Sequence, residues 1–94
     1  MTEKKLLEWS IRSRNNVADI RDYLISKNPV AAERVLDVIR QVATGLRDFP
    51  LIGHSGRRAN TRELVLTKYP YIVVYRVTAS KVIIAAVLHQ RQKH

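Results

Sequence analysis

The first half of the chain spaces its apolar residues as amphipathic helices do. Val17, Ile20 and Leu24 recur three and four residues apart, and charged side chains fall between them. This spacing predicts a helix of about 15 residues. Ser10 precedes that helix and is a suitable N-cap. Before it, the apolar residues within 6–9 predict a short edge strand.

A second helix is predicted to begin at Asn28-Pro29. The Asn side chain can accept an unpaired amide of the first turn, and Pro loses no hydrogen bond at the first helical position. Phe49-Pro50 is expected to end this helix. Two such helices with a tight connection predict an antiparallel pair that needs a common apolar surface. Its apolar face is formed by Ala32, Val35, Ile39, Val42, Ala43 and Leu46.

The second half of the chain has the composition of β-strands. After a loop over residues 51–60, segments 62–68, 71–78 and 81–89 are rich in Val, Ile, Leu and Tyr. The connection at residues 79–80 is short enough for a hairpin. The predicted order is therefore β-α-α-β-β-β. This is an α+β fold in which a two-helix antiparallel hairpin packs on one face of a small antiparallel sheet.

The two-residue period of a strand predicts which side chains share a face. Arg76 should lie on the face of Ile72 and Val74, opposite Tyr75. On the last strand, strict alternation places four side chains together: Ile83, Ala85, Val87 and His89. Arg76 and His89 would then be polar groups near strand ends, where a sheet can present them to a partner.

Length, composition and charge limit the possible functions. The 94 residues predict a single domain over residues 1–94, and the 46% of apolar residues is too high for a disordered basic tail. Seventeen Lys and Arg against eight Asp and Glu give a net charge of +9. This excess indicates a polyanionic partner such as a nucleic acid, an acidic protein segment or an anionic membrane surface.

The positive charge is concentrated in the second half. Residues 1–50 carry nine basic and seven acidic side chains, a net charge of +2. Residues 51–94 carry eight basic side chains and one acid, Glu63, a net charge of +7. The strand-rich half is therefore expected to present a basic face.

Several kinds of chemistry and location are not expected. The chain has no Cys, which excludes disulfides and fits a reducing compartment. The charged first ten residues do not resemble a secretory signal, and the longest aliphatic run, 82–88, is far shorter than the roughly 20 residues of a membrane span. His54 and His94 are too isolated in sequence to suggest a metal site. We expect a cytoplasmic protein without metal, cofactor or membrane segment.

A series of short motifs resembles one known family. In order along the chain they are Glu8-Trp9-Ser10, Ala18-Asp19-Ile20 with Tyr23-Leu24, Asn28-Pro29 before Ala31-Ala32, Leu46, Phe49-Pro50, Gly53, Arg62-Glu63-Leu64, Tyr69 to Val77, and Val87-Leu88-His89 with Arg91. Their order and spacing resemble the ParE/RelE superfamily of toxins from bacterial type II toxin–antitoxin modules. The resemblance covers nearly the whole chain. It implies the fold predicted above, a cytoplasmic toxin, and a small antitoxin whose C-terminal segment wraps it.

Two activities compete within this family. RelE-like members cut mRNA in the ribosomal A site, and ParE-like members inhibit DNA gyrase. RNA cleavage needs a base, an acid and cations for the developing phosphate charge. The resemblance to RelE implies a site with Lys residues on the second strand and an Arg at the start of the third. At the corresponding positions this chain has Glu63 and Val65 on the second strand and Ile72 on the third. Because Ile cannot stabilise a phosphate, the chain resembles ParE more closely, and ParE is taken to act by binding rather than by bond cleavage.

Seven side chains are candidate partner-binding residues: Arg57, Arg58, Arg62, Tyr75, Arg76, His89 and Arg91. If the chain is a nuclease, the catalytic candidates are His89, Arg62, Arg76 and Arg91, gathered at one edge of the sheet with His89 as acid or base.

Structural roles compete with each of these assignments. His89 could pack against the core with one ring nitrogen on a backbone carbonyl, and Tyr75 could serve only cross-strand packing. Arg57 and Arg58 could be a solvated pair in a loop. Arg76 could form an ion pair with Glu63 if the strand register allows it.

The expected partners follow from the resemblance. They are DNA gyrase as the target, a ParD-like or similar antitoxin with an acidic C-terminal segment, and DNA only through that antitoxin. In the alternative, the ribosome and mRNA are the partners. A third hypothesis is a non-toxic module that binds an antitoxin or nucleic acid. An acidic, apolar antitoxin segment along the helix pair and the basic sheet edge would offset much of the +7 charge.

Overall fold

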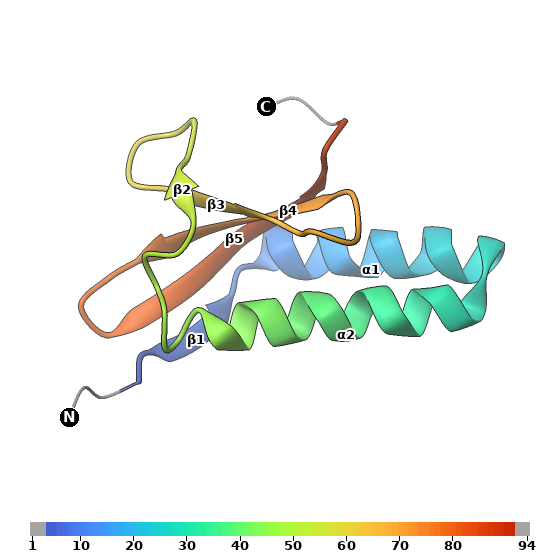
Figure 1. The fold of residues 1–94 in the computed structure, drawn as a ribbon, viewed down its shortest axis with the longest axis horizontal. Helices are drawn as coiled ribbons and strands as arrows, with labels where there is room; N and C mark the ends of the chain where they lie inside the picture. The colour runs from blue at the N-terminus through green and yellow to red at the C-terminus, as the bar shows by residue number, and fades with distance from the viewer. Residues whose placement is uncertain (1–3, 92–94) are drawn as a thin grey trace.

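Two helices cover one face of a five-stranded sheet in the computed structural model, which describes residues 4–91 (Figure 1). The α+β class and the antiparallel helix pair on one face are confirmed. His94, one of the two histidines considered as metal ligands, lies outside the described residues. The elements are β1 (Leu6–Trp9), α1 (Ile11–Lys27), α2 (Pro29–Gly45), β2 (His54–Ser55), β3 (Arg62–Val65), β4 (Tyr71–Val77) and β5 (Lys81–His89).

Both helices begin where the sequence predicts. The Ser10 hydroxyl oxygen accepts the Ser13 amide at 3.0 Å, and the Asn28 side-chain oxygen accepts the Ala31 amide at 3.2 Å. The end of the second helix was predicted too late. α2 ends at Gly45 rather than at Phe49-Pro50, because the following backbone closes tighter turns three residues long.

The sheet is mixed, which corrects the prediction of a purely antiparallel sheet. Its strand order is β1-β5-β4-β3-β2, and β1 runs parallel to β5 while the other pairs are antiparallel. The chain reaches β5 only after both helices and three strands, and parallel neighbours need such a long crossover. A short strand, β2, also lies within the predicted loop over residues 51–60, and β3 ends at Val65 instead of residue 68.

A β-bulge in β5 changes which of its side chains face the helices. Val74 pairs with Ala86 and Tyr75 pairs with Ile84, so Ala85 is an extra residue on β5. The alternation of side chains therefore shifts by one residue after Ile84. The side chains that join the main core from β5 are Val82, Ile84 and Val87.

The predicted face assignment for the last strand was wrong for this reason. Val87 and His89 lie on the same face as Ile84, because they pair with the helix-facing residues of β4. Ala86 and Leu88 lie on the opposite face, which we call the open face of the sheet, where they pack with Val74.

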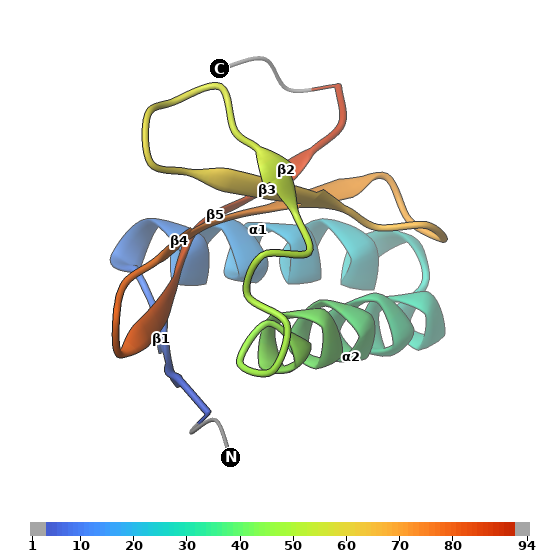
Figure 2. The same ribbon diagram turned by 60° about the vertical axis from the view of Figure 1, so that its left-hand side comes forward.

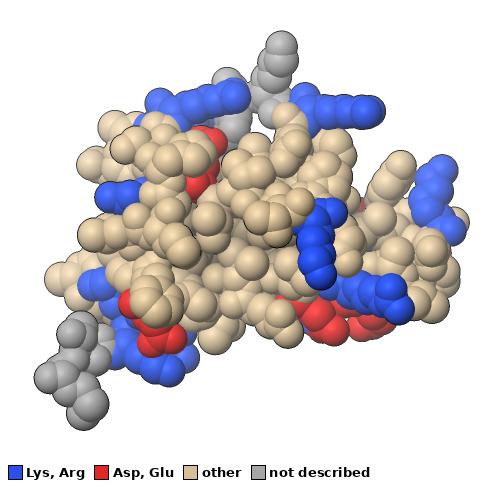
Figure 3. Space-filling view, in the orientation of Figure 1, with Lys and Arg blue, Asp and Glu red and all other residues tan. Residues whose placement is uncertain are grey.

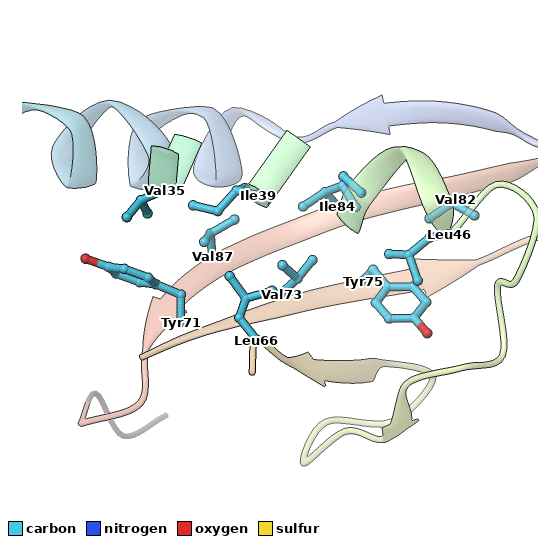
Figure 4. Close-up of a cluster of buried hydrophobic side chains, with 11 residues drawn as sticks. Val35, Ile39, Leu46, Leu66, Tyr71, Val73, Tyr75, Val82, Ile84 and Val87 are labelled. Carbon is cyan, nitrogen blue, oxygen red and sulfur yellow. The ribbon is translucent and has the colours of Figure 1, made fainter. Parts of the chain in front are cut away.

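The main core lies between the helices and the sheet (Figure 4). Figure 2 shows both helices below the sheet, and the segment that joins α2 to β2 rises from the end of α2 to the sheet. The predicted apolar face of α2 supplies much of the core, and the buried members of the cluster are Val35, Ile39, Ala43, Leu46, Leu66, Tyr71, Val73, Tyr75, Val82, Ile84 and Val87.

The start of α1 covers the edge of β5 beyond the end of β1. The Ser10 hydroxyl donates to the Ala85 carbonyl at 2.9 Å, and the Asn16 side-chain oxygen accepts the Val87 amide at 3.0 Å. These contacts satisfy backbone groups around the bulge. They also bring the first turn of α1 beside the open face.

Candidate partner-binding site

Four arginines border a hollow of about 380 Å³ on the open face of the sheet. Arg12 comes from the first turn of α1, Arg57 and Arg58 from the β2–β3 connection, and Arg76 from β4. We call these four residues the arginine face. Basic side chains lie around much of the surface visible in Figure 3. The other residues that line the hollow are Ser10, Ala59, Thr61, Glu63, Val74, Ala85 and Ala86.

Hydrogen bonds fix the loop that carries Arg57 and Arg58. The Gly56 amide donates to the Thr61 carbonyl at 2.8 Å, and the Thr61 hydroxyl donates to the Arg58 carbonyl at 2.7 Å. The Glu63 side chain reaches the loop from β3 and accepts the Arg57 amide at 3.2 Å. The two arginines therefore stand on an ordered turn.

Glu63 is the one carboxylate among the residues that line this hollow. It is buried, and it lies opposite Val74 in the β3–β4 pairing. Arg76 is two residues further along β4 and exposed, and the described residues form no ion pair between Glu63 and Arg76. The Glu63–Arg76 ion pair, considered as a structural role for Arg76, is therefore not formed. Four guanidinium groups against one buried carboxylate make this hollow suited to anionic groups.

Arg62 is held at the end of the sheet by backbone carbonyls. Its guanidinium donates to the Gly53 carbonyl at 2.7 Å and to the Leu51 carbonyl at 3.3 Å. It borders a second hollow of about 580 Å³, which Arg57 and Arg58 also line. Arg62 therefore has a structural role in the loop before β2 and also adds charge beside the arginine face.

Tyr75 is buried in the core. Its side chain is fully inaccessible to solvent, and its hydroxyl donates to the Pro50 carbonyl and accepts the Gly53 amide. Burial raises the pKa of the Tyr75 hydroxyl, and the Gly53 hydrogen bond and the Arg62 charge partly oppose this rise. The predicted place of Tyr75 on a partner-binding surface was wrong, because it points toward the helix layer.

Another concave surface lies where the helices meet the start of β4 and the end of β5. It has a volume of about 570 Å³, and we call it the helix–sheet groove. Its walls are mostly apolar, and its polar lining residues include Asn16, Asp19 and His89. Its lining residues are Asn16, Asp19, Ile20, Tyr23, Leu24, Ala31, Val35, Tyr69, Pro70, Tyr71, Val87 and His89.

His89 belongs to this groove. Its ring stands edge-on to the Tyr71 ring with centroids 5.5 Å apart, and its Nδ1 accepts the Arg91 amide at 3.1 Å. Burial, with a smaller contribution from Tyr23, raises the pKa of the Tyr71 hydroxyl. The His89 ring thus packs beside the core.

The nuclease candidates do not gather at one edge. His89 pairs with Tyr71 at the start of β4, whereas Arg76 pairs with Ile83 five residues further along the strand, a separation of roughly 17 Å. The two side chains also point to opposite faces. Arg62, which pairs with Tyr75, lies near the Arg76 end.

The described residues, 4–91, contain no group of three or more His, Cys, Asp or Glu side chains placed to hold a metal ion. Within the same range, no helix is both long and apolar enough to span a membrane.

Comparison with known proteins identifies the family. The family model described as "ParE toxin of type II toxin-antitoxin system, parDE" matches residues 7–94. The chain belongs to the ParE toxin family. The ParE-family chain is 36% identical to Y4kP of Sinorhizobium fredii over 90 residues, which cover 96% of this chain and 93% of Y4kP. It is 30% identical to Toxin RelE3 of Caulobacter vibrioides over 91 residues, which cover 95% and 98% of the two chains.

Two solved structures share the fold of this ParE-family chain. A chain of the chromosomal ParDE system from P. aeruginosa superposes with a TM-score of 0.83 at 18% identity, covering 94% of this chain and 98% of its own. A chain of the RelBE2 toxin–antitoxin complex from Mycobacterium tuberculosis superposes with a TM-score of 0.67 at 20% identity, covering 93% and 99%. The ParE/RelE resemblance inferred from the motifs is confirmed.

In this ParE-family chain, the positions expected to carry nuclease cations are apolar or acidic. Val65 and Ile72 lie directly opposite each other in the β3–β4 pairing, and Glu63 is buried opposite Val74. All four side chains belong to the open face. No cation therefore stands at these positions.

Sequence reasoning found three members of the arginine face and missed Arg12. Arg57, Arg58 and Arg76 were candidates, and the structure brings them together. Arg12 occupies an ordinary polar position of a helix, and its sequence neighbours gave no sign that it faces the sheet. The contacts of Ser10 and Asn16 with β5 around the bulge bring it to this surface.

Proposed function

We propose that this ParE-family toxin inhibits DNA gyrase by binding it, in the bacterial cytoplasm, and that a cognate antitoxin neutralises it. The observation that carries the proposal is the pairing of Val65 with Ile72. Two aliphatic side chains stand where the resemblance to RelE requires cations, and neither can stabilise the charge that develops on a phosphate during RNA cleavage.

The positions of the remaining polar groups support binding without chemistry. A general acid or base must lie within hydrogen-bond reach of the reacting atoms, close to the cation that holds the phosphate. His89 and Arg76 lie on opposite faces of the sheet, and Tyr71, the β4 partner of His89, is five residues from Arg76. A single RNA phosphate could not contact both.

The antitoxin is expected to use the hollow of the arginine face and the helix–sheet groove. Its acidic groups would pair with Arg57, Arg58 and Arg76, and its apolar side chains would fill the helix–sheet groove. We propose that the antitoxin also contacts three residues at the borders of these surfaces: Arg62, His89 and Arg91. A segment that folds on binding can span both, because disordered chains wrap large surfaces.

A supercoiling assay with purified gyrase tests the proposal. We expect the toxin to stop the conversion of relaxed plasmid to the supercoiled form, and the antitoxin from the neighbouring reading frame to restore it. Unchanged supercoiling at saturating toxin would contradict the proposal.

A ribosome-dependent mRNA endonuclease is the second candidate. The 30% identity to the protein named Toxin RelE3 favours it, because the likeness extends over 95% of this chain. Cuts at codon positions in a translated message would establish this candidate in place of gyrase inhibition.

A further inference from the structure

Three large apolar side chains are exposed within one four-residue segment between α2 and β2. Phe49, Leu51 and Ile52 are 68%, 65% and 63% exposed, respectively. We call the segment Phe49 to Ile52 the apolar loop. Single exposed hydrophobic residues are ordinary, but adjacent ones at the surface indicate contact with another molecule.

The backbone of this loop is held rigidly by two side chains of the sheet. The buried Tyr75 hydroxyl donates to the Pro50 carbonyl at 2.9 Å and accepts the Gly53 amide at 2.9 Å. Arg62 donates to the Leu51 and Gly53 carbonyls. Figure 4 shows Tyr75 at the end of the core nearest this segment. The exposed side chains therefore project from an ordered backbone, and little conformational entropy would be lost on binding.

The apolar loop adjoins positive charge. Leu51 borders the hollow of about 580 Å³ that Arg57, Arg58 and Arg62 also line, and no Asp or Glu is among the described residues that line it. A partner that receives Leu51 would therefore place its neighbouring groups against three guanidinium groups. Carboxylates suit that position.

We infer that the apolar loop is the target-binding surface of this toxin. It inserts into an apolar pocket on a folded protein, and carboxylates border that pocket. The inference rests on the proposed function, under which that protein is gyrase. A rigid projection fits a preformed pocket, whereas a disordered antitoxin segment needs a groove. The helix–sheet groove includes Ala31 and Val35 from the first half of α2, and the apolar loop follows the other end of that helix.

A double substitution, Phe49→Ser with Leu51→Ser, tests the inference. Val30→Ser is the matched control, because Val30 is 63% exposed and lies in the first turn of α2. All three side chains are at the surface, so the free energy of unfolding of each variant should lie within about 0.5 kcal/mol of the wild-type value. The measurements are inhibition of gyrase supercoiling, affinity for the antitoxin from the neighbouring reading frame, and growth arrest on expression.

We expect the double variant to need at least about ten-fold more protein for half-inhibition of gyrase, which is the usual effect of losing interface anchors. Its antitoxin affinity should stay unchanged, and Val30→Ser should match the wild type in both assays. Undiminished inhibition by the double variant would overturn the inference while the proposed function stands. A parallel loss of antitoxin affinity would also overturn it, by assigning the loop to the antitoxin.

Failure of the proposed function has a different signature. If the wild type leaves gyrase active, gyrase is not the target, and growth arrest then decides the role of the loop. If the wild type arrests growth and the double variant does not, while antitoxin affinity is intact, the loop binds a target that is a folded protein other than gyrase. Arrest that persists in the double variant, or no arrest by the wild type, would overturn the inference.

Discussion

The Tyr75 hydroxyl accepts the Gly53 amide at 2.9 Å across 22 residues of sequence. Because the same hydroxyl donates to the Pro50 carbonyl, one buried side chain of β4 fixes the segment between α2 and β2. The approach is so close that a Cβ at Gly53 would lie 2.6 Å from the Tyr75 hydroxyl oxygen and 2.9 Å from the Glu63 carbonyl oxygen. The Tyr75 contacts and the Arg62 hydrogen bonds together hold the backbone of the apolar loop.

Removal of the Tyr75 hydroxyl should destabilise the fold and loosen the loop. Tyr75→Phe leaves the Gly53 amide without its acceptor and the Pro50 carbonyl without its donor, so we expect the free energy of unfolding to fall by about 1–3 kcal/mol. Urea unfolding measures the change. Tyr23→Phe is the matched control, since Tyr23 is exposed, and should change stability by less than about 0.5 kcal/mol. Equal effects of the two substitutions would contradict the role given to the Tyr75 hydroxyl.

The two glycines at the ends of this region should respond in opposite directions. Gly53→Ala forces a Cβ against a buried hydroxyl and a backbone carbonyl, so we expect a loss of roughly 1–3 kcal/mol. Gly45→Ala meets nothing within 4 Å at the end of α2, and should be neutral or stabilise by up to about 1 kcal/mol. Thermal unfolding of both variants tests this. If Gly53→Ala is as stable as the wild type, the tight contact of Gly53 with the Tyr75 hydroxyl and the Glu63 carbonyl is contradicted.

Alkaline pH should weaken the fold through the two buried tyrosines. Burial raises the pKa of Tyr71 and of Tyr75 above the ordinary value of 10.0. Above pH 10 the unfolded chain therefore loses these protons more readily than the folded chain, and the free energy of unfolding should fall as pH rises through the raised pKa values. In Tyr75→Phe the fall should be shallower. If the free energy of unfolding has the same pH dependence in the wild type and in Tyr75→Phe, the Tyr75 hydroxyl does not contribute to the alkaline loss of stability.

The arginine face should contribute salt-dependent affinity for the antitoxin. Arg76→Gln removes a charge from the open-face hollow, and we expect weaker binding at low salt and a smaller loss of affinity as salt increases. Arg34→Gln is the control, because Arg34 is exposed on α2 and outside both concave surfaces. Calorimetric titration at several salt concentrations measures the effect. Indistinguishable affinities of the two variants would remove Arg76 from the interface.

Local signals in the sequence predicted most of the fold. The caps at Ser10 and Asn28 act within three residues, and the apolar face of α2 follows from its spacing alone. The parallel contact of β1 with β5 joins segments about 75 residues apart, and no short pattern encodes it. The bulge at Ala85 was also invisible, because neighbouring alanines suit either face of a strand.

The same distinction explains the outcome for the candidate site. Charge concentration in the second half pointed to Arg57, Arg58 and Arg76, and the structure places these three residues around one hollow. Tyr75 was misplaced because alternation tells which residues share a face, but not which face the helices cover. The bulge placed His89 on the face that the helices cover, and His89 pairs with Tyr71, five residues along β4 from Arg76.

One paired measurement tests the central claim, that this toxin acts by binding gyrase and not by cutting RNA. A single preparation is added to a gyrase supercoiling reaction and to a translation reaction whose mRNA ends are mapped. We expect supercoiling to stop and the message to remain intact. Codon-positioned cuts in the message with supercoiling unaffected would contradict this claim.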